Sequence, residues 1–229
     1  MSVSCTFRYE RKFVIADLPR RGVEHVVRRQ PALFRGIYQP RYVNNIYFDT
    51  SEYGNYRDGV DGASNRLKVR IRWYGNFFGA VEHPVLELKF KREVFVSKET
   101  FPLAGLTIER GMDLSTVADA LRRAALPMHV RNRVKGLRPV LFNRYLRNYF
   151  LSADKTCRIT IDDQLSWYSA QQRRNAFLRR VADRQSVILE MKYAQDDADA
   201  ATRIAAILPF RMGRCSKYVG GMQRLFGAA

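Results

Sequence analysis

Apolar and polar residues alternate along much of the chain, most clearly in the segment 65–74. Arg66, Lys68, Arg70 and Arg72 take its even positions, and apolar residues separate them. Because successive side chains of a β-strand point to opposite faces, this pattern puts the four cations in a row on the same face. At a spacing of roughly 7 Å and an effective dielectric of ~20, each neighbouring pair repels by about 2 kcal/mol. Either water screens these charges, or a polyanion binds along that face.

The same patterns predict the remaining elements and, from them, the fold class. No internal repeat and no Pro/Gly-rich linker divides the chain, which predicts a single domain over residues 1–229. Eight strands with short helices between them favour an α+β, mainly β fold, an eight-stranded antiparallel β-barrel with flanking helices. The predicted strands are Cys5–Ile15, Tyr42–Asp49, Asn65–Tyr74, Val85–Lys91, Val94–Phe101, Val140–Phe150, Arg158–Leu165 and Val187–Tyr193, and the predicted helices are Asp17–Arg29, Ser115–Leu126, Ala198–Leu208 and Ser216–Phe226.

Polar residues keep to one face of several predicted strands, and the intervening residues are largely apolar. One arrangement puts the apolar faces under the helices, so that the charged faces line a barrel interior that holds water and a ligand. The inverse arrangement has an apolar core with the charges outside, and periodicity alone does not separate the two. The polar residues that share one face of a predicted strand are Glu10 and Lys12; Glu87, Lys89 and Lys91; Tyr145 and Arg147; Arg158, Thr160 and Asp162; Glu190 and Lys192.

The charge balance of the 229-residue chain argues for a polyanionic partner. Forty Lys plus Arg against 22 Asp plus Glu give a net charge of +18, and such self-repulsion favours nucleic acid, anionic lipid or phosphate ligands. The segment 171–184 carries five of these arginines, among them Arg173, Arg174, Arg179 and Arg180, and is predicted to be an exposed basic hairpin or loop. Specific nucleic-acid binding is not expected, because the cations alternate with apolar strand residues rather than gathering with exposed aromatic rings.

The cysteines and the N-terminal segment bear on the cellular compartment in which the protein is expected. Cys5, Cys157 and Cys215 are odd in number and far apart, which supports neither a disulfide framework nor a zinc site. Charged residues interrupt the first fifteen positions, and no apolar run approaches membrane-spanning length. We therefore expect a cytoplasmic protein without membrane insertion; the patterns do not define its oligomeric state.

Eight short motifs extend the argument from patterns to a family. They are Tyr9-Glu10-Arg11-Lys12, Ile46-Tyr47-Phe48-Asp49-Thr50, Arg70-Ile71-Arg72-Trp73-Tyr74-Gly75, Leu86-Glu87-Leu88-Lys89, Tyr145-Leu146-Arg147, Arg158-Ile159-Thr160-Ile161-Asp162, Leu189-Glu190-Met191-Lys192 and Ser216-Lys217-Tyr218. In this order they resemble the VTC (vacuolar transporter chaperone) polyphosphate polymerase domain, over about residues 7 to 226. That domain is a triphosphate tunnel metalloenzyme.

The resemblance implies an antiparallel β-barrel tunnel whose basic interior binds a triphosphate such as ATP, or polyphosphate, with Mn²⁺ or Mg²⁺ as cofactor. Glu190 is the implied metal ligand, with Glu87 and Glu10 as counter-ions or secondary ligands. Seven cations are the implied catalytic, phosphate-gripping residues: Lys12, Arg70, Arg72, Lys89, Arg147, Arg158 and Lys217. Six further residues are expected to bind phosphate: Arg66, Lys68, Lys98, Tyr145, Ser216 and Lys192.

The first strand departs from another branch of this superfamily. The thiamine-triphosphatase and class IV adenylate cyclase branch has a Glu-X-Glu-X-Lys pattern, whereas this chain has Arg8-Tyr9-Glu10-Arg11-Lys12. A cation thus replaces one metal-binding carboxylate, which favours a polymerase that transfers the ATP γ-phosphate to a growing polyphosphate chain. A triphosphatase and a noncatalytic polyphosphate-binding module remain the alternatives. The regulatory SPX domain of the eukaryotic polymerases has no counterpart, so we expect a stand-alone, bacterial-type form.

Overall fold

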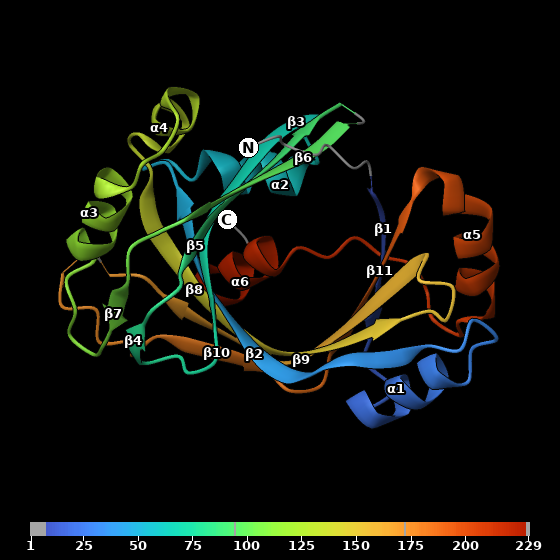
Figure 1. Ribbon diagram of the computed structural model, residues 1–229. Helices are drawn as coiled ribbons and strands as arrows, with labels where there is room; N and C mark the ends of the chain where they lie inside the picture. The colour runs from blue at the N-terminus through green and yellow to red at the C-terminus, as the bar shows by residue number, and fades with distance from the viewer. Residues whose placement is uncertain (1–7, 94, 172, 228–229) are drawn as a thin grey trace. The chain divides into compact units, whose positions relative to one another are not determined.

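The computed structural model describes residues 8–93, 95–171 and 173–227 (Figure 1). Its main sheet has the strand order β1-β11-β9-β8-β2-β3-β5-β6, with β10 paired to β9, while β4 and β7 form a small second sheet. The pairs β1–β11, β11–β9, β2–β3, β3–β5 and β5–β6 are antiparallel. The strands are β1 (Arg8–Ile15), β2 (Arg35–Asp49), β3 (Asn65–Tyr74), β4 (Gly79–Val81), β5 (Val85–Arg92), β6 (Phe95–Pro102), β7 (Leu106–Ile108), β8 (Arg138–Leu151), β9 (Cys157–Ser169), β10 (Arg180–Asp183) and β11 (Val187–Ala194).

Helices lie between these strands and after the last of them. The helices are α1 (Arg20–Arg28), α2 (Gly54–Asp61), α3 (Ser115–Arg123), α4 (Met128–Val134), the short 3₁₀ helix η1 (Gln195–Asp197), α5 (Ala198–Ile207) and α6 (Lys217–Phe226). No helix within the described residues has both the length and the apolar content needed to cross a bilayer.

The predicted fold class, α+β and mainly β with flanking helices, is confirmed. All eight predicted strands are present, and β2 is longer than predicted because it begins at Arg35 rather than Tyr42. Residues 5–7 of the first predicted strand and Val94 of the fifth lie outside the described residues. The path of strands begins at β1 and ends at β6, and closure of the barrel stays a prediction.

The chain divides into two compact units, and the long strands β2, β8 and β9 contribute to both. The predicted single domain stays a prediction, and each unit is described by itself. Unit 1 consists of Met1–Tyr42, Tyr145–Leu165 and Ala182–Cys215, and unit 2 consists of Val43–Arg144, Ser166–Val181 and Ser216–Ala229.

In unit 1, one face of β1, β11 and β9 packs under helices. The register places Phe13 opposite Leu189, and Leu189 opposite Ile161, so these three fully buried residues form one row across the strands. They belong to a core that includes Val27 of α1 and Ile204 of α5 (Figure 1). Burial of this amphipathic helical face stabilises the unit and leaves the alternate strand positions on the other face.

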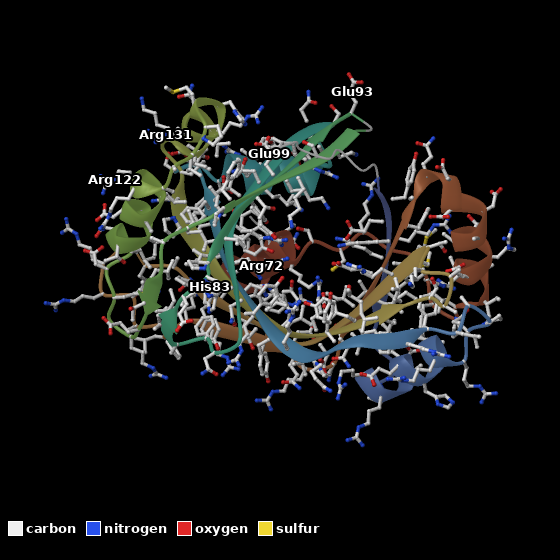
Figure 2. The ribbon with its side chains drawn as sticks, in the orientation of Figure 1. Arg72, His83, Glu93, Glu99, Arg122 and Arg131 are labelled. Atoms are coloured by element: carbon white, nitrogen blue, oxygen red, sulfur yellow. The ribbon has the colours of Figure 1, made fainter. Side chains whose placement is uncertain are left out.

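Unit 2 follows the same plan with different helices. Ile46, Ile71 and Leu86 lie opposite one another across β2, β3 and β5 and are completely buried. Their core includes Val117 of α3 and Val130 of α4. In Figure 2, Arg122 and Arg131 extend from these outer helices, whereas Arg72 lies among the strands.

The two cores bear on the arrangements that periodicity left open. In each unit the apolar strand face lies against helices, and the charged positions of the same strands are on the opposite face. The expected packing of the apolar faces under helices is therefore present in both units, and a charged barrel interior stays a prediction.

Helix α6 packs in unit 2 through a glycine. A Cβ atom on Gly221 would overlap the indole ring of Trp167 and lie 2.9 Å from Leu141, so only glycine permits this approach. The helix starts where the sequence predicts, because the Ser216 hydroxyl accepts the Val219 amide hydrogen as an N-cap.

Candidate functional site

The polar face of unit 1 is built by cross-strand rows. Lys12 on β1 lies opposite Glu190 on β11, which lies opposite Thr160 on β9. The next row joins Glu10, Lys192 and Arg158 in the same order. Opposite charges thus face each other between β1 and β11, which is favourable, whereas Lys192 and Arg158 are like charges directly opposite between β11 and β9, which is unfavourable.

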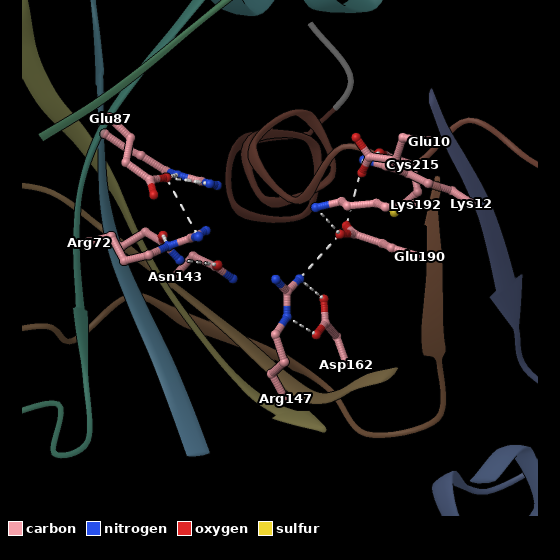
Figure 3. Close-up of polar contacts among 12 residues, drawn as sticks. Glu10, Lys12, Arg72, Glu87, Asn143, Arg147, Asp162, Glu190, Lys192 and Cys215 are labelled. Carbon is pink, nitrogen blue, oxygen red and sulfur yellow. Dashed lines mark hydrogen bonds and ion pairs between the residues drawn. The ribbon is translucent and has the colours of Figure 1, made fainter. Parts of the chain in front are cut away.

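Glu190 is the centre of this face (Figure 3). Its side chain is 8% exposed and lies 3.3 Å from Arg147 Nη2, 3.7 Å from Lys12 Nζ and 3.7 Å from Lys192 Nζ. The Lys12 ammonium also lies 3.2 Å from a Glu10 carboxylate oxygen and donates to the Cys215 carbonyl at 3.2 Å. One ammonium therefore bridges two carboxylates.

Arg147 is held by a carboxylate that the sequence analysis did not select. Asp162 accepts two hydrogen bonds of 2.6 Å from this guanidinium and is completely buried. Burial by itself would lower the pKa of Arg147, but the Asp162 charge opposes it, and the pKa is raised well above its usual value. The Tyr145 ring lies 5.2 Å from the guanidinium and is also buried. Asp162 lies four residues after Arg158 and therefore on the same face of the strand. This pattern could have identified Asp162 from the sequence.

The polar face of unit 2 is strongly cationic. Lys68, Lys89 and Lys98 lie opposite one another across β3, β5 and β6. Like charges directly opposite are destabilising, so this row favours an anion between or above the lysines. The face carries seven cations, Arg66, Lys68, Arg70, Arg72, Lys89, Lys91 and Lys98, against the carboxylates of Asp49 and Glu87.

Glu87 is tightly bound by three of these cations. It accepts hydrogen bonds from Arg70 Nε at 2.7 Å and from Lys98 Nζ at 2.6 Å, and Arg72 Nη1 lies 3.5 Å away. Burial would raise the pKa of Glu87, but the charges of Arg70, Arg72 and Lys98 outweigh it and hold the pKa well below the usual range. The pKa of Lys98 is lowered, because partial desolvation of its ammonium group and the charges of the two arginines outweigh the opposing effect of Glu87.

Arg70 and Arg72 are positioned by neutral side chains that the sequence analysis did not identify. Arg72 Nε donates to Asn45 Oδ1 at 3.0 Å, and Asn45 in turn donates to Asn143 at 3.2 Å (Figure 3). Arg70 donates to the Tyr47 hydroxyl at 3.3 Å, and the Tyr47 ring stacks on Tyr218. Two buried asparagines in strands are the signal that a sequence reading could have used, since strands are depleted in asparagine.

The start of α6 adds a hydroxyl and a cation. Lys68 Nζ donates to Ser216 Oγ at 2.9 Å, and Lys217 is the first residue of the helix. A cation at a helix N-terminus opposes the helix dipole, whereas an anion bound there would be favoured.

The structure brings the predicted site residues together within each unit. In unit 1 they are Glu10, Lys12, Tyr145, Arg147, Arg158, Glu190 and Lys192, and in unit 2 they are Arg66, Lys68, Arg70, Arg72, Glu87, Lys89, Lys98, Ser216 and Lys217. Arg158, Lys89 and Lys98 are exposed, whereas Arg72, Tyr145 and Arg147 are buried. Their catalytic and phosphate-binding roles stay predictions.

The carboxylates differ in how well they suit a metal. No group of three or more His, Cys, Asp or Glu side chains in the described part of the chain could hold an ion alone. Glu87 already accepts short hydrogen bonds from two cations, which suits the expected role of a counter-ion better than that of a metal ligand. Glu190 and Glu10 are hard oxygen donors near the shared Lys12, a set that suits Mg²⁺ or Mn²⁺ when phosphate oxygens and waters complete the coordination.

Comparisons with known proteins agree with this geometry. The family model of the VTC domain matches residues 7–226. A candidate adenylate cyclase of Vibrio parahaemolyticus is 11% identical with a TM-score of 0.51, covering 92% of this chain and 95% of that chain. A candidate adenylyl cyclase of Hippeastrum with a dominant triphosphatase activity is 13% identical with a TM-score of 0.53, covering 95% and 96%. These two likenesses show a shared fold, and no curated protein matches the chain.

Proposed function

The chain belongs to the VTC domain family, and we propose that it is a metal-dependent polyphosphate polymerase that transfers the γ-phosphate of ATP to a growing polyphosphate chain. The observation that carries the proposal is the polar face of unit 2, where seven cations face two carboxylates. Both carboxylates already have partners, since Glu87 pairs with three cations and Asp49 accepts backbone hydrogens at the start of α2. Among the described residues this face therefore carries a net positive charge, which favours binding of a polyanion.

The residues of this face suit successive phosphate groups. Arginine presents a planar fork for bidentate contacts with phosphate oxygens, and Arg70 and Arg72 are held at defined positions by Glu87 and Asn45. The Lys68–Lys89–Lys98 row supplies ammonium point charges beside them. A linear polyphosphate would relieve the mutual repulsion of the lysines, which a neutral ligand would not.

Phosphoryl transfer requires mainly positioning and neutralisation of charge on the transferred group. The attacking terminal oxygen of polyphosphate is already anionic near pH 7, because its last pKa is about 6, so no general base is required. Arg147, fixed by Asp162, is a rigid cation for a phosphate group in unit 1. Glu190 and Glu10 would hold the Mn²⁺ or Mg²⁺ ion, which when bound neutralises charge on phosphate oxygens.

Triphosphate hydrolysis is the second candidate function. The Hippeastrum protein with the same fold has a dominant triphosphatase activity. Against hydrolysis, the first strand of this chain has Arg8 where the hydrolase branch has a carboxylate, which leaves Glu10 as the carboxylate of that motif. Fewer metal-binding carboxylates disfavour a two-metal activation of water.

Product analysis tests the proposal. Purified protein with ATP and Mn²⁺ is expected to form ADP and acid-insoluble polyphosphate that an exopolyphosphatase digests. Glu190→Gln is expected to lose this turnover while keeping metal-free tripolyphosphate binding, because the amide keeps the shape but not the charge. Orthophosphate in place of chains would assign a triphosphatase, and tight polyphosphate binding without turnover would assign a noncatalytic receptor.

A further inference from the structure

Thr160 carries a buried hydroxyl whose hydrogen-bonding capacity is unused. The residue is 3% exposed, and its Oγ1 atom has no hydrogen-bond partner among the described residues. Buried polar atoms nearly always have partners, since an unpartnered one destabilises the fold. Valine has almost the same shape and would avoid this penalty. A hydroxyl at this position therefore indicates a role in a state other than the one described.

The register places this hydroxyl beside Glu190. Thr160 lies directly opposite Glu190, and side chains in such pairs have Cβ atoms roughly 4.5–5.5 Å apart. Both residues are on the polar face, where Lys12 is the opposite neighbour of Glu190 on its other side. Glu190 is thus flanked by a cation on β1 and by a neutral hydroxyl on β9.

Three cations lie at longer distances from Glu190 than a short ion pair would have. Arg147 Nη2 is at 3.3 Å, and the ammonium groups of Lys12 and Lys192 are at 3.7 Å. A divalent ion on one carboxylate oxygen would repel all three cations and weaken these contacts. A neutral donor is compatible with the ion, and Thr160 is the neutral hydroxyl directly opposite.

We propose that Thr160 is a positioning residue for the metal: when Glu190 binds the ion through one carboxylate oxygen, the Thr160 hydroxyl donates a hydrogen bond to the other oxygen. This inference rests on the proposed function, in which Glu190 is a metal ligand. Partners of this kind orient a ligating carboxylate, and their loss weakens metal affinity by roughly 10- to 100-fold.

The test compares Thr160→Val with Thr160→Ser, which keeps the hydroxyl, and with Glu190→Gln. Mn²⁺ binding is measured by isothermal titration with tripolyphosphate present, tripolyphosphate binding is measured without metal, and thermal unfolding is followed without either ligand. Thr160→Val is expected to weaken Mn²⁺ binding by roughly 10-fold or more. Its metal-free tripolyphosphate affinity should be unchanged and its unfolding midpoint no lower than wild type, while Thr160→Ser keeps Mn²⁺ affinity.

Two results would overturn the inference alone. The first is Mn²⁺ affinity that Thr160→Val leaves intact although Glu190→Gln loses it. The second is an equal loss of metal-free tripolyphosphate binding in Thr160→Val, which would make the hydroxyl a direct phosphate contact. Wild-type Mn²⁺ affinity in Glu190→Gln would instead overturn the metal assignment of the proposed function, and the inference with it.

Discussion

Replacing Glu87 by glutamine removes the buried negative charge that three cations share. The amide can still accept one hydrogen bond from Arg70, but the charge that offsets Arg70, Arg72 and Lys98 is lost. Removing one partner of a buried ion pair typically costs about 3–5 kcal/mol. Here Arg70 and Lys98 have side chains 25% and 50% exposed and can regain water, whereas Arg72, at 9%, cannot. We therefore expect a loss of about 2–4 kcal/mol in the free energy of unfolding.

The matched control for Glu87→Gln is Glu99→Gln. Glu99 lies on β6 and pairs with His129 at 2.8 Å and Arg133 at 3.6 Å, both of which are largely exposed (Figure 2). Exposed pairs contribute about 0–1 kcal/mol, so this variant should unfold close to wild type. For a domain of this size, Glu87→Gln should lower the thermal midpoint by roughly 5–15 °C.

The effect of Glu87→Gln on the free energy of unfolding is expected to depend on pH. The pKa of Glu87 in the folded protein lies below its ordinary value of 4.5. Its contribution is therefore complete above about pH 4.5 and is lost as the pH falls toward the folded pKa. The stability difference between wild type and Glu87→Gln, from urea unfolding, should be largest near neutral pH and should shrink below pH 4.5. A difference under about 0.5 kcal/mol at pH 7 would refute the assignment of Glu87 as the shared counter-ion.

Two further substitutions test the buried Arg147–Asp162 pair and the close packing of α6. Asp162→Asn breaks the buried pair with Arg147 and should cost about 3–5 kcal/mol in urea unfolding, and a cost below about 1 kcal/mol would contradict the pairing. Gly221→Ala forces a methyl group against Trp167 and should cost about 1–3 kcal/mol. Gly220→Ala is its control, because only the flexible Arg224 side chain is near, and the helix should gain up to about 1 kcal/mol. Equal stability of the two alanine variants would contradict the close packing of α6.

The alternation of residue types predicted the strands well where one face is buried. β3 has the predicted bounds because its apolar positions pack into a core under helices and its charged positions alternate with them on the other face. The first part of β2 is mostly exposed and carries no such alternation, so its start was missed. Helix α2 was missed for another reason. Its amide hydrogens at Asn55 and Tyr56 are capped by the buried Asp49 carboxylate at the end of β2, a contact that no local pattern reports.

Strand parity also placed the charged site residues on shared faces, because the side-chain period does not depend on tertiary contacts. The partners of those residues were not predictable in this way. Asp162 and Arg147 are on different strands, and the pairing follows from strand order rather than from spacing. The same holds for Asn45, which fixes Arg72 from the neighbouring strand.

The two buried glutamates show why residue type alone does not identify a metal ligand. From the sequence, Glu87 and Glu190 are equivalent, since each lies two residues before a lysine on an amphipathic strand. In the fold, Glu87 accepts short hydrogen bonds of 2.6 and 2.7 Å, whereas the cations around Glu190 are 3.3 to 3.7 Å away. Displacing short, charge-assisted hydrogen bonds costs more than displacing long ion pairs. An incoming divalent ion would therefore displace the cations around Glu190 more easily than those around Glu87, which supports the proposal that Glu190 rather than Glu87 is the metal ligand.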